Sequence, residues 1–318
     1  MNPHPPQSVD RRSWLSRSMG TAVGTAMSAA MMSAAFGSNA SNSSAVEPDE
    51  DDQRPTAKAL KGRIRQSVMG WCFKPMTAAD LSTTGKHLGL VAIEGIDAKD
   101  YAASKAVGLE ISLVGSHGFA KGPVDTENHA FVESKLRESI DLAVQYGSPN
   151  AITFTGMRVN NMRDEVAKRN CLECWKRVIG YAEEKKITLC LEHLNSRDNS
   201  HPMKGHPGYF GDDVELCIEL IKAMDSPSFK LLFDIYHVQV MHGDVIRRIR
   251  QYHPLIAHYH TAGNPGRGEL DDKQEINYPP ILRAILETGY SGYVAQEFIP
   301  TWPDPVAALE HAIRLCDV

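Results

Sequence analysis

Residues 188–195 read Thr-Leu-Cys-Leu-Glu-His-Leu-Asn, a short apolar run that ends on polar side chains and includes a carboxylate. A run of this length is typical of a strand buried on both faces, as in a parallel sheet. Similar runs lie at residues 230–236, 256–261 and 293–298, and each has an ionisable side chain near its end. Four such runs in succession predict a parallel sheet whose carboxyl-terminal edge collects polar side chains.

Four earlier runs extend this pattern toward the amino terminus. They occupy residues 66–73, 90–95, 109–115 and 151–156, and amphipathic segments separate the runs. Strands that alternate with helices eight times predict closure into a (β/α)₈ TIM barrel, a single α/β domain. A doubly wound open sheet is the alternative, but no Gly-x-Gly-x-x-Gly motif follows the first run, where a dinucleotide-binding fold needs one.

Helices are expected between the runs, for example at residues 131–146 and 169–185. The second segment contains Cys171 and Cys174, which share a helix face and favour a reduced structural pair over a redox pair. In the first segment, an apolar side chain recurs at every fourth position and predicts one buried face: Val132, Leu136, Ile140 and Val144.

Residues 1–45 predict a twin-arginine-type signal peptide that precedes the barrel. Arg11 and Arg12 come before an uncharged stretch of mostly small residues, and Ser43-Ser44-Ala45 offers a cleavage site. This favours export to the periplasm; an uncleaved membrane anchor and a plain disordered tail are the alternatives. The stretch is too rich in Gly, Ser and Thr to favour a stable membrane span. An acidic, polar linker is expected at residues 46–62, and the barrel at 63–318.

The composition limits the kind of partner. The 318 residues carry a formal net charge of −5, whereas nucleic-acid-binding proteins show a clear basic excess. We therefore expect a small-molecule substrate and no nucleic-acid partner. The composition leaves open whether the chain forms a homo-oligomer.

Four ionisable side chains fall near the carboxyl ends of the last four predicted strands: Glu192, Asp234, His260 and Glu297. In a barrel this edge carries the active site. A carboxylate in an apolar strand must be paired, protonated or metal-bound, because burying it alone is too unfavourable. A satisfied structural acid would explain one such residue more easily than four in register. The set suits a divalent metal ion; its oxygen ligands favour Mn²⁺ or Mg²⁺, and its histidine leaves Zn²⁺ and Co²⁺ open.

Other polar residues near this edge have two interpretations each. His237 lies just beyond the sixth predicted strand and would reach a substrate or else lie on a surface loop. Arg267 follows the seventh strand in a Gly/Pro-rich loop and would bind substrate oxygens or else remain solvated. His258 shares a strand face with His260 and is expected one layer deeper, as a core or supporting residue.

The segment 195–213 is rich in Gly, Pro and His and is expected to form a lid or rim over the barrel. Its two further histidines, His201 and His206, are expected at the surface. His117, near the third strand, is the remaining candidate for an additional metal ligand.

These residues resemble the hydroxypyruvate isomerase group of the xylose isomerase-like barrel superfamily. The similarity runs from Arg63 to the carboxyl terminus, and its most specific element is Glu-Ile-Asn-Tyr-Pro at residues 275–279 after a Pro-Gly-Arg loop. The other motifs that carry it are Leu191-Glu192, Phe233-Asp234-Ile-Tyr-His237, His258-Tyr-His260-Thr-Ala-Gly-Asn-Pro-Gly-Arg267, Asp271-Asp272, Thr288-Gly-Tyr290 and Gln296-Glu297-Phe298.

The resemblance implies an intramolecular oxidoreductase of the aldose–ketose type, which would convert hydroxypyruvate to tartronate semialdehyde through an enediolate. It implies that Glu192, Asp234, His260 and Glu297 bind the metal and that Glu192 and Glu297 are also the catalytic proton-transfer pair. It further implies that two more residues hold substrate oxygens, as matching positions do in related epimerases: His237 and Arg267.

The chain departs from familiar hydroxypyruvate isomerases at His260, where they have glutamine, and at Gly268, where they tend to have histidine. The more distant sugar epimerases have histidine at the position of His260. A sugar or keto-sugar epimerase is therefore the alternative enzyme. An exported, non-catalytic binding protein and a hydrolase related to the endonuclease IV barrels are alternatives of other classes.

Overall fold

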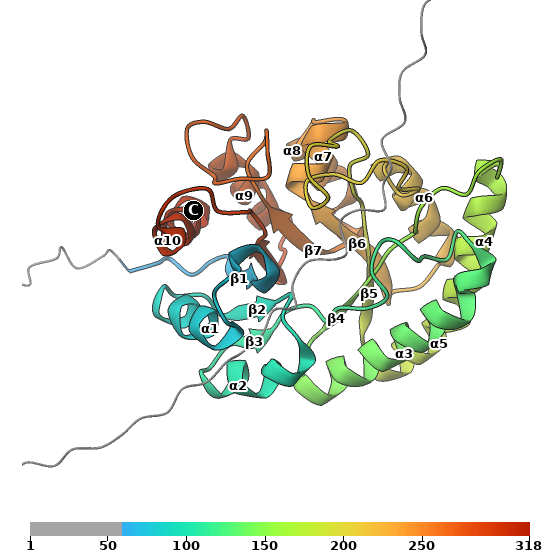
Figure 1. The fold of residues 1–318 in the computed structure, drawn as a ribbon, viewed down its shortest axis with the longest axis horizontal. Helices are drawn as coiled ribbons and strands as arrows, with labels where there is room; N and C mark the ends of the chain where they lie inside the picture. The colour runs from blue at the N-terminus through green and yellow to red at the C-terminus, as the bar shows by residue number, and fades with distance from the viewer. Residues whose placement is uncertain (1–58) are drawn as a thin grey trace, which may run out of the picture. The chain divides into compact units, whose positions relative to one another are not determined.

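The computed structural model describes residues 59–318, which form a barrel of parallel strands with helices outside it (Figure 1). The predicted (β/α)₈ TIM barrel is confirmed. The predicted signal peptide and most of the predicted linker lie outside the described residues. The strands are β1 (Arg65–Met69), β2 (Ala92–Glu94), β3 (Glu110–Ile111), β4 (Asn150–Thr153), β5 (Thr188–Glu192), β6 (Phe229–Asp234), β7 (Ile256–Thr261) and β8 (Tyr293–Gln296).

Parallel pairing joins the strands in the order β3-β2-β1-β8-β7-β6-β5-β4. The ring is completed just beyond β3, where Val114 forms a parallel bridge with Ala151 of β4. The backbone N–H of Val114 donates to the carbonyl of Asn150 at 3.0 Å, and Ile152 donates back to Val114 at the same distance. Two backbone hydrogen bonds therefore close the barrel, and Asn150 Nδ2 adds a third across this seam by donating to the carbonyl of Ser112 at 3.2 Å.

Ten α-helices follow the strands in the described part of the chain. None of these helices, within residues 59–318, is both long and apolar enough to cross a membrane. They are α1 (Ala78–His87), α2 (Tyr101–Ala106), α3 (His129–Tyr146), α4 (Asp164–Lys176), α5 (Ile179–Lys185), α6 (Val214–Met224), α7 (Ile235–Met241), α8 (Val245–Tyr252), α9 (Tyr278–Glu287) and α10 (Pro305–Cys316).

One residue of the buried face predicted for α3 points elsewhere. Val144 is 51% exposed, whereas the three earlier apolar positions are fully buried and Ala143 completes the face. The reason is geometric: twelve residues advance a helix by about 120° beyond whole turns, so a strict four-residue repeat drifts away from the core.

The helix predicted at residues 169–185 is two helices. Helix α4 ends at Lys176, and α5 begins at Ile179. Cys171 and Cys174 lie on α4 as buried, free thiols, and burial raises the pKa of Cys174 to about 12. A thiol with so high a pKa is a poor nucleophile at neutral pH, which agrees with a structural role.

Alternation along each strand directs every second side chain into the barrel. Cys190 and Leu232 belong to a small apolar cluster there, and Glu192 and Asp234 lie two residues further along the same strands. The intervening Phe233 joins the larger core between strands and helices. The barrel interior is therefore apolar at mid-height and polar at its carboxyl end, where a site can form.

Candidate metal centre

Four side chains meet at the carboxyl end of the barrel. Glu192 ends β5, Asp234 ends β6, His260 lies on β7, and Glu297 follows β8. All four are buried, and one potential ligand atom of each lies within 4.8 Å of the others. The structure thus brings together the four residues nominated from the sequence as metal ligands.

Three polar atoms of this cluster lack hydrogen-bond partners among the described residues, and they face one another. His260 Nδ1 lies 2.6 Å from Glu297 Oε2 and 3.3 Å from Glu192 Oε1. None of these three atoms has a hydrogen-bond partner of acceptable geometry among the described residues. Buried polar atoms are almost always satisfied, and carboxylate oxygen with imidazole nitrogen is a ligand set that divalent cations accept. The three atoms therefore fit a divalent metal ion.

The carboxyl groups of the cluster differ in pKa. Burial raises the pKa of Asp234 to about 7, and the charge of Glu297 adds to the shift. Burial also raises the pKa of Glu192. At Glu297 burial is outweighed by the charges of Arg267 and His260, which lower its pKa to about 2. Without a further positive charge, the three carboxyl groups are not fully ionised together at neutral pH.

Arg267 points into the cluster rather than into solvent. It lies in the loop between β7 and α9, and only 2% of it is exposed. Its Nη1 donates to the carbonyl of Met203 at 2.6 Å, while Nη2 lies 2.6 Å from Glu297 Oε2 and 3.4 Å from Asp234 Oδ2. The interpretation as a solvated turn residue is therefore wrong.

His237 is fully buried in the first turn of α7, where Asp234 Oδ1 accepts its backbone N–H. Its Nδ1 accepts hydrogen bonds from the backbone N–H of Asn195 at 3.1 Å and from Asn195 Nδ2 at 2.6 Å. The ring proton therefore sits on Nε2. Burial and then the charge of Arg267 lower the pKa of His237, so the ring is neutral. The sequence did not identify Asn195, which orients this ring.

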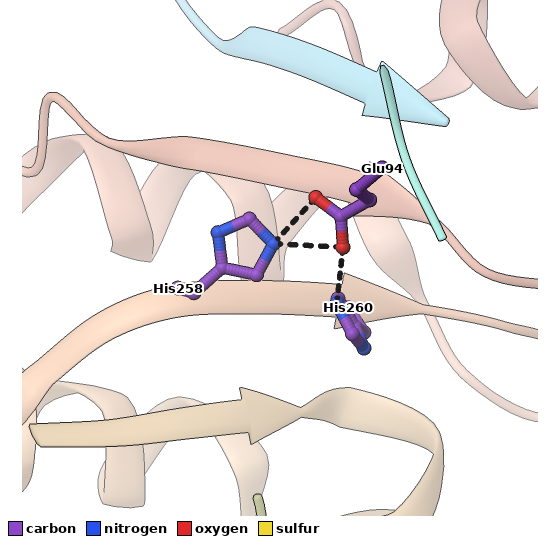
Figure 2. A group of neighbouring side chains, drawn as sticks. All are labelled: Glu94, His258 and His260. Atoms are coloured by element: carbon purple, nitrogen blue, oxygen red, sulfur yellow. Dashed lines mark hydrogen bonds and ion pairs between the residues drawn. The ribbon is translucent and has the colours of Figure 1, made fainter. Parts of the chain in front are cut away.

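Glu94, at the end of β2, contacts both histidines of β7 (Figure 2). Its carboxylate is 2.8 Å from His260 Nε2 and 2.9 Å from His258 Nε2. Although burial opposes the shift, these histidines hold the pKa of Glu94 well below its usual range. Sequence reasoning missed Glu94, yet its signal matches that of Glu192: a carboxylate that ends a short apolar run.

A cavity of about 230 Å³ opens beside the cluster and is lined by Glu192, Glu297 and Arg267. This volume is below the range of sites that hold drug-sized ligands, so the cavity suits a small molecule. The rest of the wall is mainly apolar and includes Trp71, Leu113, Phe119, Ile152, Phe154 and Leu194.

The segment 195–213 contributes Met203 and His206 to this cavity. His206 was expected at the surface, but only 5% of it is exposed. Loop composition does not reveal which way a side chain points, which explains the error. His117 was a candidate ligand, but its Nε2 instead hydrogen-bonds Thr153 Oγ1 at 3.0 Å.

Comparison with known proteins identifies the family. The model of the xylose isomerase-like TIM barrel family matches residues 80–317. The 2-oxo-tetronate isomerase of Cupriavidus necator is 31% identical over 172 residues, covering 53% of this chain and 63% of that protein. The hydroxypyruvate isomerase of Escherichia coli is 25% identical over 185 residues, covering 54% of this chain and 69% of that protein. The matched part of the chain spans 61% of a human relative's length.

Solved structures share the fold. The E. coli 3-keto-D-glucoside 4-epimerase superposes with a TM-score of 0.67 at 15% identity, covering 80% of this chain and 98% of that one. The family 2 AP endonuclease of Brucella melitensis superposes with a TM-score of 0.66 at 21% identity, covering 78% of this chain and 96% of that one. At these identities the likeness concerns the fold alone. The family match covers most of the sequence, and the chain belongs to the xylose isomerase-like TIM barrel family.

Proposed function

We propose that this chain is a metal-dependent isomerase of a small hydroxy-carbonyl compound, with hydroxypyruvate as the first candidate substrate and tartronate semialdehyde as its product. The observation that carries the proposal is that buried atoms of Glu192, His260 and Glu297, none with a hydrogen-bond partner among the described residues, converge beside a small cavity. The isomerase names of the E. coli and Cupriavidus relatives support the same class of reaction.

Glu192, Asp234, His260 and Glu297 would hold the metal. Three carboxylates favour Mn²⁺ or Mg²⁺, and the imidazole keeps Zn²⁺ and Co²⁺ as candidates. When bound, a divalent cation supplies Lewis-acid stabilisation of the negative charge that develops on substrate oxygens. The apolar walls of the cavity strengthen such electrostatic effects because they lower the local dielectric.

Glu192 and Glu297 are the proposed proton-transfer pair. Both line the cavity, and their environments drive their pKa values apart. In the metal-free chain, Arg267 holds Glu297 ionised despite its burial, whereas burial favours the protonated form of Glu192. A bound cation would favour the ionised form of both carboxyl groups, so either can accept a proton. One glutamate would remove the carbon-bound proton, and the same or the opposite one would return a proton at the neighbouring carbon, while the hydroxyl proton passes to the former carbonyl oxygen.

His237 and Arg267 are the proposed substrate-binding residues. His237 Nε2 and Arg267 Nε are buried donors that lack hydrogen-bond partners among the described residues. Leaving a buried donor unpaired is unfavourable by roughly 1–3 kcal/mol, so a substrate oxygen that accepts from it contributes to binding. Neutral His237 can donate to a hydroxyl or carbonyl oxygen without adding charge to the site.

A keto-sugar epimerase is the second candidate, and the charge of the cavity favours it. Arg267 is the only lysine or arginine among the described lining residues. Its guanidinium already lies 2.6 Å from Glu297 and 3.4 Å from Asp234. A substrate carboxylate would compete with these residues for the same cation, whereas an uncharged keto-sugar would not.

Turnover by the metal-stripped protein, reloaded in turn with Mn²⁺, Mg²⁺, Co²⁺ or Zn²⁺, tests both candidates. Metal-dependent formation of tartronate semialdehyde from hydroxypyruvate would support the first. Metal-dependent epimerisation of a member of a ketose panel, without that product, would support the second. Metal binding with no turnover of any substrate would overturn both and leave a non-catalytic binding protein.

A further inference from the structure

Glu94 is a buried carboxylate that none of the proposed chemical steps uses. It lies on β2, across the barrel from the two histidines of β7 that it contacts (Figure 2). The side chains of Glu94, His258 and His260 are all fully buried. TIM barrels normally fill this interior with branched apolar residues, and a buried charge with its partners is no more stable than such packing. Stability therefore does not explain why a carboxylate stands here.

The carboxylate of Glu94 is saturated with hydrogen-bond donors. Ser112 Oγ and Ser67 Oγ donate to it at 2.5 and 3.1 Å, and His260 Nε2 and His258 Nε2 lie at 2.8 and 2.9 Å. Four donors match the acceptor capacity of one ionised carboxylate. These are hydrogen-bond distances, and a second metal ion between these side chains would have to replace the contacts of both histidines with the carboxylate.

The contact with Glu94 determines which nitrogen of His260 is free. An ionised carboxylate only accepts, so His260 must present a proton at Nε2. The lone pair of the neutral ring then lies on Nδ1, the atom that faces Glu192 Oε1 and Glu297 Oε2. Histidine ligands of metals are commonly oriented in this way, by a carboxylate on the other ring nitrogen.

We propose that Glu94 is the positioning residue of the metal centre: it holds the His260 ring with its proton on Nε2 and with Nδ1 directed at the three carboxyl groups. His258 supports this arrangement, because its Nε2 contacts both carboxylate oxygens of Glu94, Oε2 at 2.9 Å and Oε1 at 3.2 Å, and restrains the rotation of that carboxylate. The inference rests on the proposed metal site.

The test compares Mn²⁺ binding by calorimetry in the metal-stripped full chain and in Glu94→Gln. The amide of glutamine either accepts weakly from Nε2 or donates to it, and in the second case the ring proton moves to Nδ1. We expect the affinity for Mn²⁺ to fall roughly 10- to 100-fold, with one ion still bound per chain. Ser112→Ala is the matched control, because it removes a donor to the same carboxylate without touching His260, and its affinity should stay close to wild type.

Nitrogen NMR of the Zn²⁺-loaded wild-type chain tests the inference without any substitution. We expect a proton on Nε2 of His260 and none on Nδ1; a proton on Nδ1 would overturn the proposal even if Glu94→Gln failed to fold. Equal losses of affinity in Glu94→Gln and Ser112→Ala would also overturn it, as would two Mn²⁺ ions in wild type and one in Glu94→Gln. Tight wild-type binding that Glu94→Gln leaves unchanged would refute this inference alone, whereas a wild-type chain that binds no divalent metal would refute the proposed function as well.

Discussion

Glu297 is the residue whose chemical role is most easily separated from its role as a ligand. In Glu297→Gln the side chain keeps its shape and one ligand oxygen but can no longer accept a proton. We expect turnover of the active substrate to fall by roughly 10²- to 10⁴-fold, because a general base is lost. Mn²⁺ binding should weaken but persist. Steady-state kinetics and calorimetry on the same preparation measure the two effects.

Glu173→Gln, an exposed substitution of the same kind on α4, is the matched control and should leave turnover unchanged. Near-normal turnover in Glu297→Gln would remove this glutamate from the proposed proton-transfer pair. Complete loss of metal binding would instead show that Glu297 is an indispensable ligand.

The protonation of the four-residue cluster predicts how metal affinity depends on pH. Burial, reinforced by Glu297, raises the pKa of Asp234 to about 7, so a proton occupies Asp234 below that pH. The charge of Glu297 raises the pKa of His260 despite burial, so this ring also holds a proton that a metal must displace. Mn²⁺ affinity should therefore increase from about pH 6 to about pH 8, by up to tenfold per unit for each proton released.

Calorimetry in buffers of different ionisation enthalpy counts the protons released when Mn²⁺ binds. We expect at least one proton at about pH 6, and fewer in Asp234→Asn, which has no titratable group at that position. A pH-independent affinity would mean that the carboxyl groups are already ionised in the metal-free chain.

The sequence predicts those site residues that interrupt an apolar strand, and it predicts few of the others. Glu192 and Asp234 stand out because a carboxylate is not expected at the end of a buried run. Glu94 gives the same signal and was overlooked because its strand lies far from the densest motifs. Asn195 and His206 could not have been found, because the path of a long loop depends on tertiary contacts that its composition does not encode.

At the scale of elements, α10 offers a test of folding that leaves the site alone. Asp304 is exposed and caps this helix, because its side chain accepts the backbone N–H groups of Val306 and Ala307 at 2.9 and 3.1 Å. In Asp304→Ala we expect the free energy of unfolding to fall by about 1 kcal/mol, since two helix-terminal donors lose their acceptor. Denaturant titration measures this change.

Asp304→Ser is the matched control, because a serine hydroxyl also caps helices and should recover most of the loss. Mn²⁺ affinity should be the same in both variants and in wild type. If Asp304→Ser were as unstable as Asp304→Ala, the cap would not be the source of the effect.

The elements differ in how far the sequence predicts them. All eight strands lie within a few residues of the predicted runs, because a buried strand must be apolar whatever its neighbours are. The break between α4 and α5 at residues 177–178 contains no Pro, and the nearest Gly, Gly180, already lies inside α5. The prediction that Val144 is buried was wrong because a four-residue apolar repeat drifts away from the buried face over several turns.

At the scale of the whole molecule, barrel closure could be predicted from the count of strands, since eight parallel βα units leave no edge unpaired. The small number of hydrogen bonds where the ring closes could not be predicted from the sequence. Strand β3 has only two residues, and the ring is completed by the bridge between Val114 and Ala151. Hydrogen bonding across this seam depends on how the loop after β3 is packed, which no local pattern encodes. The export signal and linker predicted for the amino terminus stay predictions.

Because the proposed ligands come from several strands of one closed barrel, removing the metal should lower the stability of the whole domain. Without a cation, the buried carboxyl groups Glu192, Asp234 and Glu297 face Arg267 and His260 alone, and some must stay protonated. An ion that binds only the folded state at about 100 times its Kd adds about 2.7 kcal/mol. For a domain of this size we therefore expect the Tm to rise by roughly 5–10 °C when Mn²⁺ is added to the chelated protein. Differential scanning calorimetry measures the shift; Glu173→Gln should retain it, and Glu192→Gln, which replaces a charged ligand by a neutral one, should reduce it. An equal Tm with and without Mn²⁺ would show that the four residues at the barrel mouth do not form a metal site.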